Sequence, residues 1–107
     1  MIILQGKGAS KGKYIGRACL IESINDFSKV QEGDIVVVHS SSPAWTVPML
    51  QAGALVSELG GIICHTAIVA REMGIPCVVG VANIFDHIKD GCILEIDGEL
   101  GKVCINE

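Results

Sequence analysis

Residues 60–80 have the sequence GGIICHTAIVAREMGIPCVVG, and this stretch decides the fold. After the paired glycines, the residue spacing predicts a helix over about Thr66 to Met73. Gly74 would end that helix, and Pro76 two residues later would keep it from continuing. The apolar residues from Cys77 to Val81 then predict a strand. The stretch therefore predicts a helix, a tight turn and a strand around which the rest of the chain can be placed.

Further strands are expected on both sides of this unit. The six predicted strands are Arg17–Glu22, Asp34–His39, Ala54–Ser57, Cys77–Val81, Cys92–Ile96 and Lys102–Ile105. Ser42-Pro43 predicts the start of a short helix that runs through Leu50 and is ended by Gly53. Asp97-Gly98 and Gly101 predict a hairpin between the last two strands. The chain is therefore predicted to form a compact α/β fold with about six strands and two or three short helices.

The composition excludes several functional classes. Of the 107 residues, 50% are hydrophobic, 19% are charged and thirteen are glycines, which is too apolar for disorder and too rich in turns for a helical bundle. We find no linker or repeat, so residues 1–107 are predicted to form one domain. A net charge of -4 argues against a nucleic-acid partner. The apolar runs are too short to cross a membrane and no signal peptide is evident, so a cytoplasmic protein is expected.

The cysteines and histidines leave a metal site as one alternative. Five cysteines without a C-x-x-C pair fit neither a disulfide framework nor a zinc ribbon, so most are expected in the core. Cys64-His65 could bind a metal together with His39, His87 or another cysteine, but adjacent side chains rarely converge on one ion. Cys64 could also be a nucleophile with a histidine base, although no motif places an orienting Asn or Asp. No bound metal is expected.

The glycine-rich opening, residues 6–13, suggests a phosphate-binding loop. A P-loop requires glycine where Lys7 stands and Ser or Thr where Tyr14 stands, and the dinucleotide fingerprint requires glycine where Lys11 stands. Both patterns fail. The segment is therefore predicted to be a turn between strands, and no cofactor is expected to bind to this chain.

His65 has more favourable surroundings for chemistry. It stands at the amino end of the predicted helix, whose N–H groups and partial positive charge attract anions such as phosphate. The same charge disfavours the imidazolium and so favours the neutral, nucleophilic ring. Gly60 and Gly61 have no side chains and leave room for a partner's site to close over the histidine. A histidine that only caps the helix through hydrogen bonds is the alternative that position alone leaves open.

Residues 60–80 closely resemble the phosphohistidine, or swivelling, domain of PEP-utilising enzymes, whose pattern is G-G-x-x-S/C-H-x-A-I-x-A-R-x-x-G-I-P-x-V-x-G. The resemblance covers nearly the whole chain. Residues 8–18 are similar to the family's opening segment, residues 33–37 to its G-D-I-L-V strand, and Asp90-Gly91 with Asp97-Gly98 to its closing hairpins. Such a domain occurs in pyruvate phosphate dikinase, phosphoenolpyruvate synthase, enzyme I of the sugar phosphotransferase system and rifampin phosphotransferase.

The resemblance implies a β/β/α fold and a phosphoryl carrier, in which His65 accepts phosphate and the domain swings between two active sites. It also implies that Ser57, at the position of a family threonine, hydrogen-bonds the histidine and sets its tautomer. Thr66 follows the histidine as it does in enzyme I, and its hydroxyl is a candidate for contacting the phosphate. Gly60-Gly61 and Arg71 are expected near the substrate. Because Arg71 lies about one and a half turns from His65, docking or packing is equally consistent with its position.

Two features set this chain apart from the family pattern. Ile62-Ile63 replaces the usual Arg-Thr or Met-Thr, which makes the rim of the site more apolar. The chain is also too short to contain a nucleotide-binding domain and a PEP-binding barrel. We therefore expect a phosphotransferase component that needs a nucleotide-binding and/or PEP/pyruvate-binding domain or subunit in trans, with magnesium at that partner's donor site. The alternative is a non-catalytic interaction module with the same fold.

Overall fold

The structure of the chain is a computed structural model, and it describes residues 1–40 and 45–106. Its strands are β1 (Ile2–Gln5), β2 (Lys7–Ser10), β3 (Lys13–Ile21), β4 (Ile35–Val38), β5 (Ala54–Ser57), β6 (Cys77–Val79), β7 (Ile93–Asp97) and β8 (Lys102–Asn106). Its helices are the 3-10 helices η1 (Ile24–Lys29) and η3 (Ile84–Asp86) and the α-helices α1 (Thr46–Met49) and α2 (His65–Met73).

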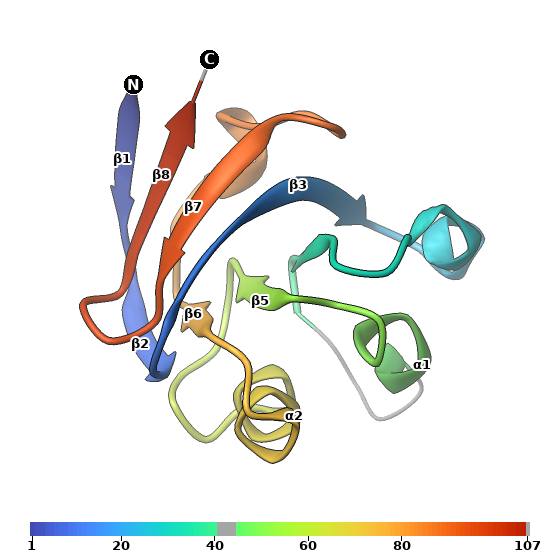
Figure 1. Ribbon diagram of the computed structural model, residues 1–107, viewed down its shortest axis with the longest axis horizontal. Helices are drawn as coiled ribbons and strands as arrows, with labels where there is room; N and C mark the ends of the chain where they lie inside the picture. The colour runs from blue at the N-terminus through green and yellow to red at the C-terminus, as the bar shows by residue number, and fades with distance from the viewer. Residues whose placement is uncertain (41–44, 107) are drawn as a thin grey trace.

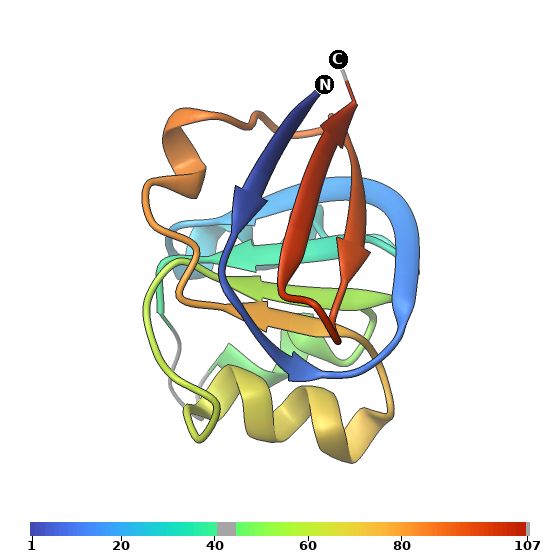
Figure 2. The same cartoon turned by 90° about the vertical axis from the view of Figure 1, so that its left-hand side faces the viewer.

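The strands are linked in the order β1-β8-β7-β3-β4-β5-β6-β2. The four strands β3, β4, β5 and β6 pair in parallel, and the remaining pairs are antiparallel. Figures 1 and 2 show that β1, β7 and β8 fold over one face of the parallel strands, while α1 and α2 lie on the other side. The predicted α/β fold class and the β/β/α arrangement are both confirmed.

The parallel strands are buried on both faces, and this explains their continuous apolar sequences. In β4, Ile35 and Val37 belong to the core that includes residues of β7 and β8. The alternate residues Val36 and Val38 belong to the core that includes residues of α1 and α2. Because successive side chains of a strand point to opposite faces, one run of four aliphatic residues contributes to both cores.

The described residues form more strands than the six predicted. The additional strands, β1 and β2, lie within residues 2–10, where β1 pairs with β8 and β2 pairs with β6. The prediction of a turn over residues 6–13 was wrong for the part that forms β2, because glycine is rare in strands and its presence favours a loop. The predicted helix start at Ser42-Pro43 lies outside the described residues, whereas the predicted hairpin between β7 and β8 is confirmed.

The turn of that hairpin packs directly on β2, and three glycines allow the contact. A Cβ at Gly98 would lie 1.8 Å from the carbonyl oxygen of Ser10, and one at Gly8 would lie 2.3 Å from that of Gly98. Gly101 has a left-handed φ of 73° and would place a Cβ 2.6 Å from the Gly6 oxygen. Only glycine fits at these positions, and the glycine-rich opening is therefore required by packing.

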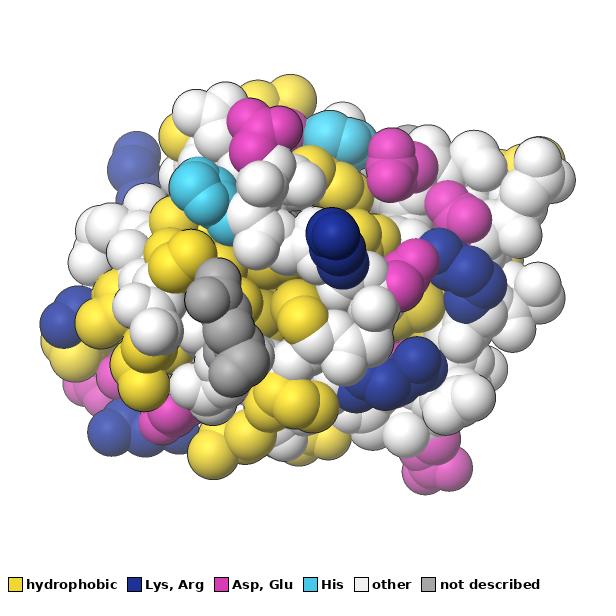
Figure 3. All heavy atoms as spheres, turned by 90° about the horizontal axis from the view of Figure 1, so that it is seen from above, with side chains coloured by type: hydrophobic (Ala, Val, Ile, Leu, Met, Phe, Trp, Pro, Cys, Tyr) yellow, Lys and Arg dark blue, Asp and Glu magenta, His cyan; other side chains and the backbone are white. Residues whose placement is uncertain are grey.

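The surface seen from above carries side chains of both charges lying among one another (Figure 3). Ion pairs tie several of the charged residues together, for example Arg17 to Asp34 at 2.7 Å and Lys29 to Asp90 at 2.8 Å. No helix in the described part of the chain is long and apolar enough to cross a bilayer.

Candidate functional site

α2 begins at His65, and the loop before it is tied to the ends of two parallel strands. The main-chain N–H of Glu58 donates to the carbonyl of Val38 at 2.9 Å. The N–H of Leu59 donates to the carbonyl of His39 at 2.8 Å. These bonds extend the pairing of β4 and β5 beyond the strands, so the loop leaves the sheet in a defined direction before it turns into α2.

Gly60 and Gly61 serve this loop in different ways. Gly60 has a φ of 104°, and a Cβ there would lie 2.9 Å from the sulfur of Cys64, so both conformation and space require glycine. A Cβ at Gly61 would meet no atom of the described residues within 4 Å. The open space at Gly61 is consistent with the expectation that a partner can approach His65 from this side.

Thr46, the first residue of α1, contacts the candidate nucleophile. Its Oγ1 lies 3.1 Å from Nε2 of His65, a hydrogen-bond distance in which either atom can donate, depending on the tautomer. The amino ends of α1 and α2 are therefore adjacent. The sequence contained no signal for this contact, because 19 residues and the whole of β5 separate Thr46 from His65.

The side chain of Ser57 forms hydrogen bonds within the loop before α2. Its hydroxyl lies 2.6 Å from the carbonyl of Leu59 and 3.3 Å from that of His39. The hydroxyl has one hydrogen, and both of these neighbours accept it, so Ser57 donates within the loop that leads to His65. Thr46 is thus a contact of the imidazole that the resemblance did not indicate, and the orienting role of Ser57 stays a prediction.

The positions of Thr66 and Arg71 bear on whether either side chain can contact a phosphate at His65. Thr66 is 1% exposed, on the inward face of α2, which argues against direct contact with a phosphate approaching from solvent. The Nε of Arg71 donates to the carbonyl of Ala9 in β2 at 2.9 Å. Arg71 thus ties α2 to β2, as the packing alternative supposed, at a rise of about 9 Å from His65 along the helix.

A second histidine lies at the same edge of the parallel strands. Nδ1 of His39 lies 2.6 Å from Oε1 of Glu58, and its ring stacks on Phe85 with centroids 3.8 Å apart. His39 follows β4 and Glu58 follows β5, and the parallel pairing brings the two together. This pair, too, was missed from the sequence, because only the register of the strands juxtaposes the two residues.

The cysteines do not provide a metal site among residues 1–40 and 45–106, where no three His, Cys, Asp or Glu side chains are suitably grouped. The absence of a stoichiometric metal stays a prediction. Cys77 lies in the core beneath α2, and burial raises the pKa of its thiol to about 12. The Cys77 thiol is therefore protonated at neutral pH and is not a nucleophile.

The chain is similar in sequence to a known protein family and to several known proteins. The family model described as "PEP-utilising enzyme, mobile domain" matches residues 30–101. A "probable phosphoenolpyruvate synthase" of Methanothermobacter thermautotrophicus is 41% identical over 102 residues, which cover 95% of this chain and 15% of the relative. Another protein with the same description, from Archaeoglobus fulgidus, is 44% identical, again over 95% of this chain and over 14% of the relative.

Among solved structures, an NMR solution structure of an Enzyme I protein superposes with a TM-score of 0.65 and 32% identity. The superposition covers 75% of this chain and 33% of that chain. The chain thus spans only 15% or 14% of the length of these two curated relatives. The relatives contain further regions to which nothing in this chain corresponds.

Proposed function

The chain belongs to the family of PEP-utilising enzyme mobile domains, and from this we propose that it is a phosphoryl carrier whose acceptor is His65. The observation that supports the assignment most directly is the position of His65. It is the first residue of α2, preceded by the paired glycines and open space at Gly61. Cytoplasmic location is part of the same proposal.

In the proposed reaction, one nitrogen of the neutral His65 ring attacks the phosphorus of a donor. The N–P bond forms as the P–O bond to the donor breaks, and the donor oxygen leaves with the electron pair of that bond. The other ring nitrogen keeps its proton. The partial positive charge at the start of α2 stabilises the bound phosphoryl group. Transfer to an acceptor oxygen reverses these bond changes and restores the neutral ring.

Thr46 controls the ring in this proposal. Its Oγ1 lies 3.1 Å from Nε2, so this hydrogen bond holds the imidazole in one orientation in either tautomer. Attack through Nε2 requires this contact to open, whereas attack through Nδ1 leaves it in place. Ser57 acts indirectly, because its hydrogen bond to Leu59 shapes the loop that leads to His65.

The donor site is proposed to lie on another domain or subunit that binds a nucleotide, phosphoenolpyruvate or pyruvate. The length of the relatives supports a separate donor site, because they are far longer than the chain. The chemistry supports it as well, because phosphoryl transfer needs cations around the donor. Magnesium would belong to that partner. Gly60-Gly61 would then lie against the partner's active site.

The experiment uses the Methanothermobacter relative as donor, with its residue aligned to His65 replaced by alanine. Incubated with that protein and labelled phosphoenolpyruvate, the chain should gain one phosphoryl group by intact mass. The variant His65→Ala should gain none, while the controls His39→Ala and His87→Ala should be labelled like the unmodified chain. Labelling that persists in His65→Ala would contradict the proposal, as would an unmodified chain that neither this donor nor the small phosphoryl donor phosphoramidate can label.

A further inference from the structure

The sequence around the candidate site is almost free of charge. Between Asp34 and Arg71, Glu58 is the one Asp, Glu, Lys or Arg residue. Its side chain is 17% exposed and lies against His39. The surface that surrounds His65 therefore presents no exposed charged side chain from this long stretch, unlike the face with mixed charges in Figure 3.

Large aliphatic side chains are exposed there instead. The side chains that we name the apolar rim are Val47 (67% exposed), Leu50 (60%), Leu59 (59%), Ile62 (52%), Ile63 (82%) and Ile68 (44%). Soluble monomeric proteins rarely expose so many neighbouring aliphatic side chains, and such patches mark interaction sites. The apolar rim includes Ile62-Ile63, the pair that departs from the family pattern.

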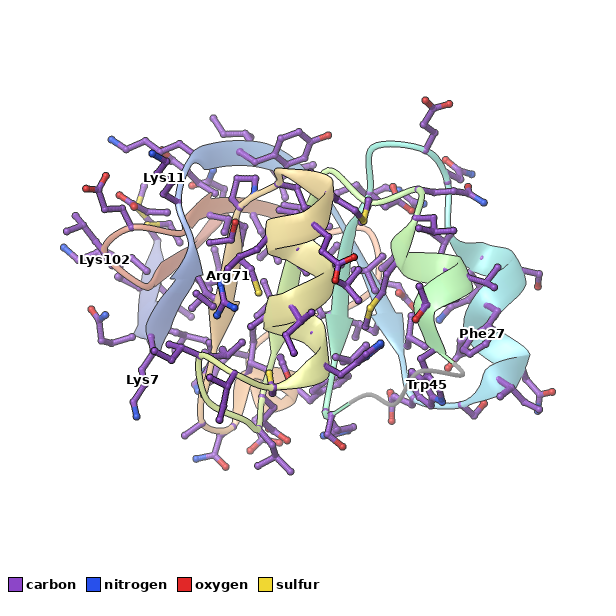
Figure 4. The ribbon with its side chains drawn as sticks, turned by 90° about the horizontal axis from the view of Figure 1, so that it is seen from below. Lys7, Lys11, Phe27, Trp45, Arg71 and Lys102 are labelled. Carbon is purple, nitrogen blue, oxygen red and sulfur yellow. The ribbon has the colours of Figure 1, made fainter. Side chains whose placement is uncertain are left out.

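Three elements place the apolar rim around His65. The Thr46–His65 contact brings Val47, the next residue of α1, beside the start of α2. The loop contributes Ile62-Ile63, two and three residues before His65. Ile68 lies one turn beyond His65, on the same face of α2. Figure 4 views the molecule from this side, with α1 and α2 lying next to each other.

Resting on the proposed function, we propose that the apolar rim is the docking surface for the phosphoryl-donor domain, and that this domain has an uncharged, apolar surface around its own active site. Transfer requires the His65 ring to come within bonding distance of the donor phosphorus, so the surrounding rim is covered in the transfer complex. A charged surface on the donor would lose its hydration against the rim without gaining a partner. An apolar surface gains by the same burial.

The lysine and arginine side chains on the other side of α2 form an alternative surface on which a partner could dock. Lys7, Lys11, Arg71 and Lys102 lie together on one flank in Figure 4 and could attract an acidic partner. However, Arg71 is held by Ala9, and Lys102 lies opposite Asp97 in the sheet. Docking through these cations would weaken steeply with salt, whereas docking through the apolar rim would not. Salt dependence therefore separates the two surfaces.

The test measures the rate of labelling of the chain by the same Methanothermobacter donor. The variants are Ile63→Asp and Ile62→Asp in the rim, and the matched control is Ile15→Asp, since Ile15 is 62% exposed on β3. We expect each rim variant to lower kcat/KM for transfer about tenfold or more and Ile15→Asp to leave it unchanged. Between about 0.1 and 1 M salt, a range of one decade, the rate for the unmodified chain should change less than about threefold.

A small-molecule donor, phosphoramidate, keeps the chemistry separate from docking. The rate of His65 labelling by phosphoramidate measures the direct effect of the new carboxylates on the chemistry. The loss of rate with the protein donor should exceed that effect about tenfold in Ile62→Asp and Ile63→Asp, because only the protein donor has to dock. Equal transfer from the protein donor to the rim variants, or a steep loss with salt, would overturn the apolar docking surface while leaving the carrier function standing. A self-associating chain that Ile63→Asp makes monomeric without slowing transfer would assign the rim to a second copy and likewise overturn it. Failure of both donors to label the unmodified chain would reject the carrier function itself.

Discussion

At the scale of the residue, the account depends on how the His65 ring is held. His65 was predicted from its place at the start of a helix behind two glycines, and all of those signals lie within a few residues of one another. Its hydrogen-bond partner was not predictable in this way. Thr46 reaches His65 because the first residues of α1 and α2 are adjacent, whereas Ser57, the nearer residue in sequence, bonds to Leu59.

Replacing Thr46 tests this assignment. Thr46→Val keeps the shape of the side chain but removes the hydroxyl. For attack through Nδ1, the loss of one hydrogen bond of ~0.5–1.5 kcal/mol should slow single-turnover phosphoryl transfer about two- to tenfold. Thr46→Ser should restore most of the rate. Ser57→Ala should leave the rate within about twofold while lowering the free energy of unfolding by ~1 kcal/mol. If Ser57→Ala slows transfer more than Thr46→Val does, the roles have been assigned the wrong way round.

At the scale of the element, strands and helices were predicted correctly where the pattern of apolar residues fits one kind of secondary structure. The strands β4 and β5 were predicted from continuous aliphatic runs, and α2 from its glycine and proline boundaries. By contrast, β1 and β2 escaped prediction because their neighbouring glycines favour a turn. Those glycines are needed for the hairpin of β7 and β8 to approach β2, which is a contact across about 90 residues of sequence. Local propensity contains no information about such an approach.

The close packing of this hairpin gives a stability prediction. Gly98→Ala would place a methyl group 1.8 Å from the Ser10 oxygen, so the hairpin must shift, and the free energy of unfolding should fall by ~2 kcal/mol or more. Gly61→Ala is the matched control, because no atom of the described residues lies within 4 Å of its added carbon, and it should change stability by less than ~0.5 kcal/mol. Urea unfolding measures both. A Gly98→Ala protein as stable as Gly61→Ala would show that the contact is looser than described.

The junction of η1 with the segment before β7 predicts a dependence on pH. Burial alone would raise the pKa of Asp90, but the N–H of Leu20 at 2.7 Å and the ammonium of Lys29 at 2.8 Å outweigh it and lower the pKa. The Asp90 carboxylate therefore stabilises the fold above the unfolded-state pKa near 4, and this contribution is lost as the pH falls through the lower folded-state pKa.

The variant Asp90→Asn tests this pH dependence, because it removes the carboxylate that titrates. Between pH 5 and 3, a span of about two units around the unfolded-state pKa, the free energy of unfolding should fall more steeply for the unmodified chain than for Asp90→Asn. Glu32→Gln, at an exposed position, is the control and should follow the unmodified chain. Parallel curves for the unmodified chain and Asp90→Asn would mean that the Asp90 interactions do not contribute.

At the scale of the whole molecule, the chain is proposed to be one component of a phosphotransfer system. Mixed with ATP or phosphoenolpyruvate alone, the purified chain should not become phosphorylated, because one helix start supplies ~2 kcal/mol of electrostatic stabilisation at most and the opening segment matches neither nucleotide-binding fingerprint. Intact mass measures this. Stoichiometric self-phosphorylation would reveal a donor site within residues assigned to the sheet.

The central claim is that His65 both accepts and returns a phosphoryl group, and a pulse–chase experiment tests it most directly. The chain is labelled by the substituted Methanothermobacter donor with labelled phosphoenolpyruvate, re-purified, and mixed with fresh donor and an excess of pyruvate. The account predicts that the peptide containing His65 holds the label after the pulse and loses it during the chase as labelled phosphoenolpyruvate forms. Label found on another residue, or label on His65 that the chase cannot remove, would contradict the carrier function.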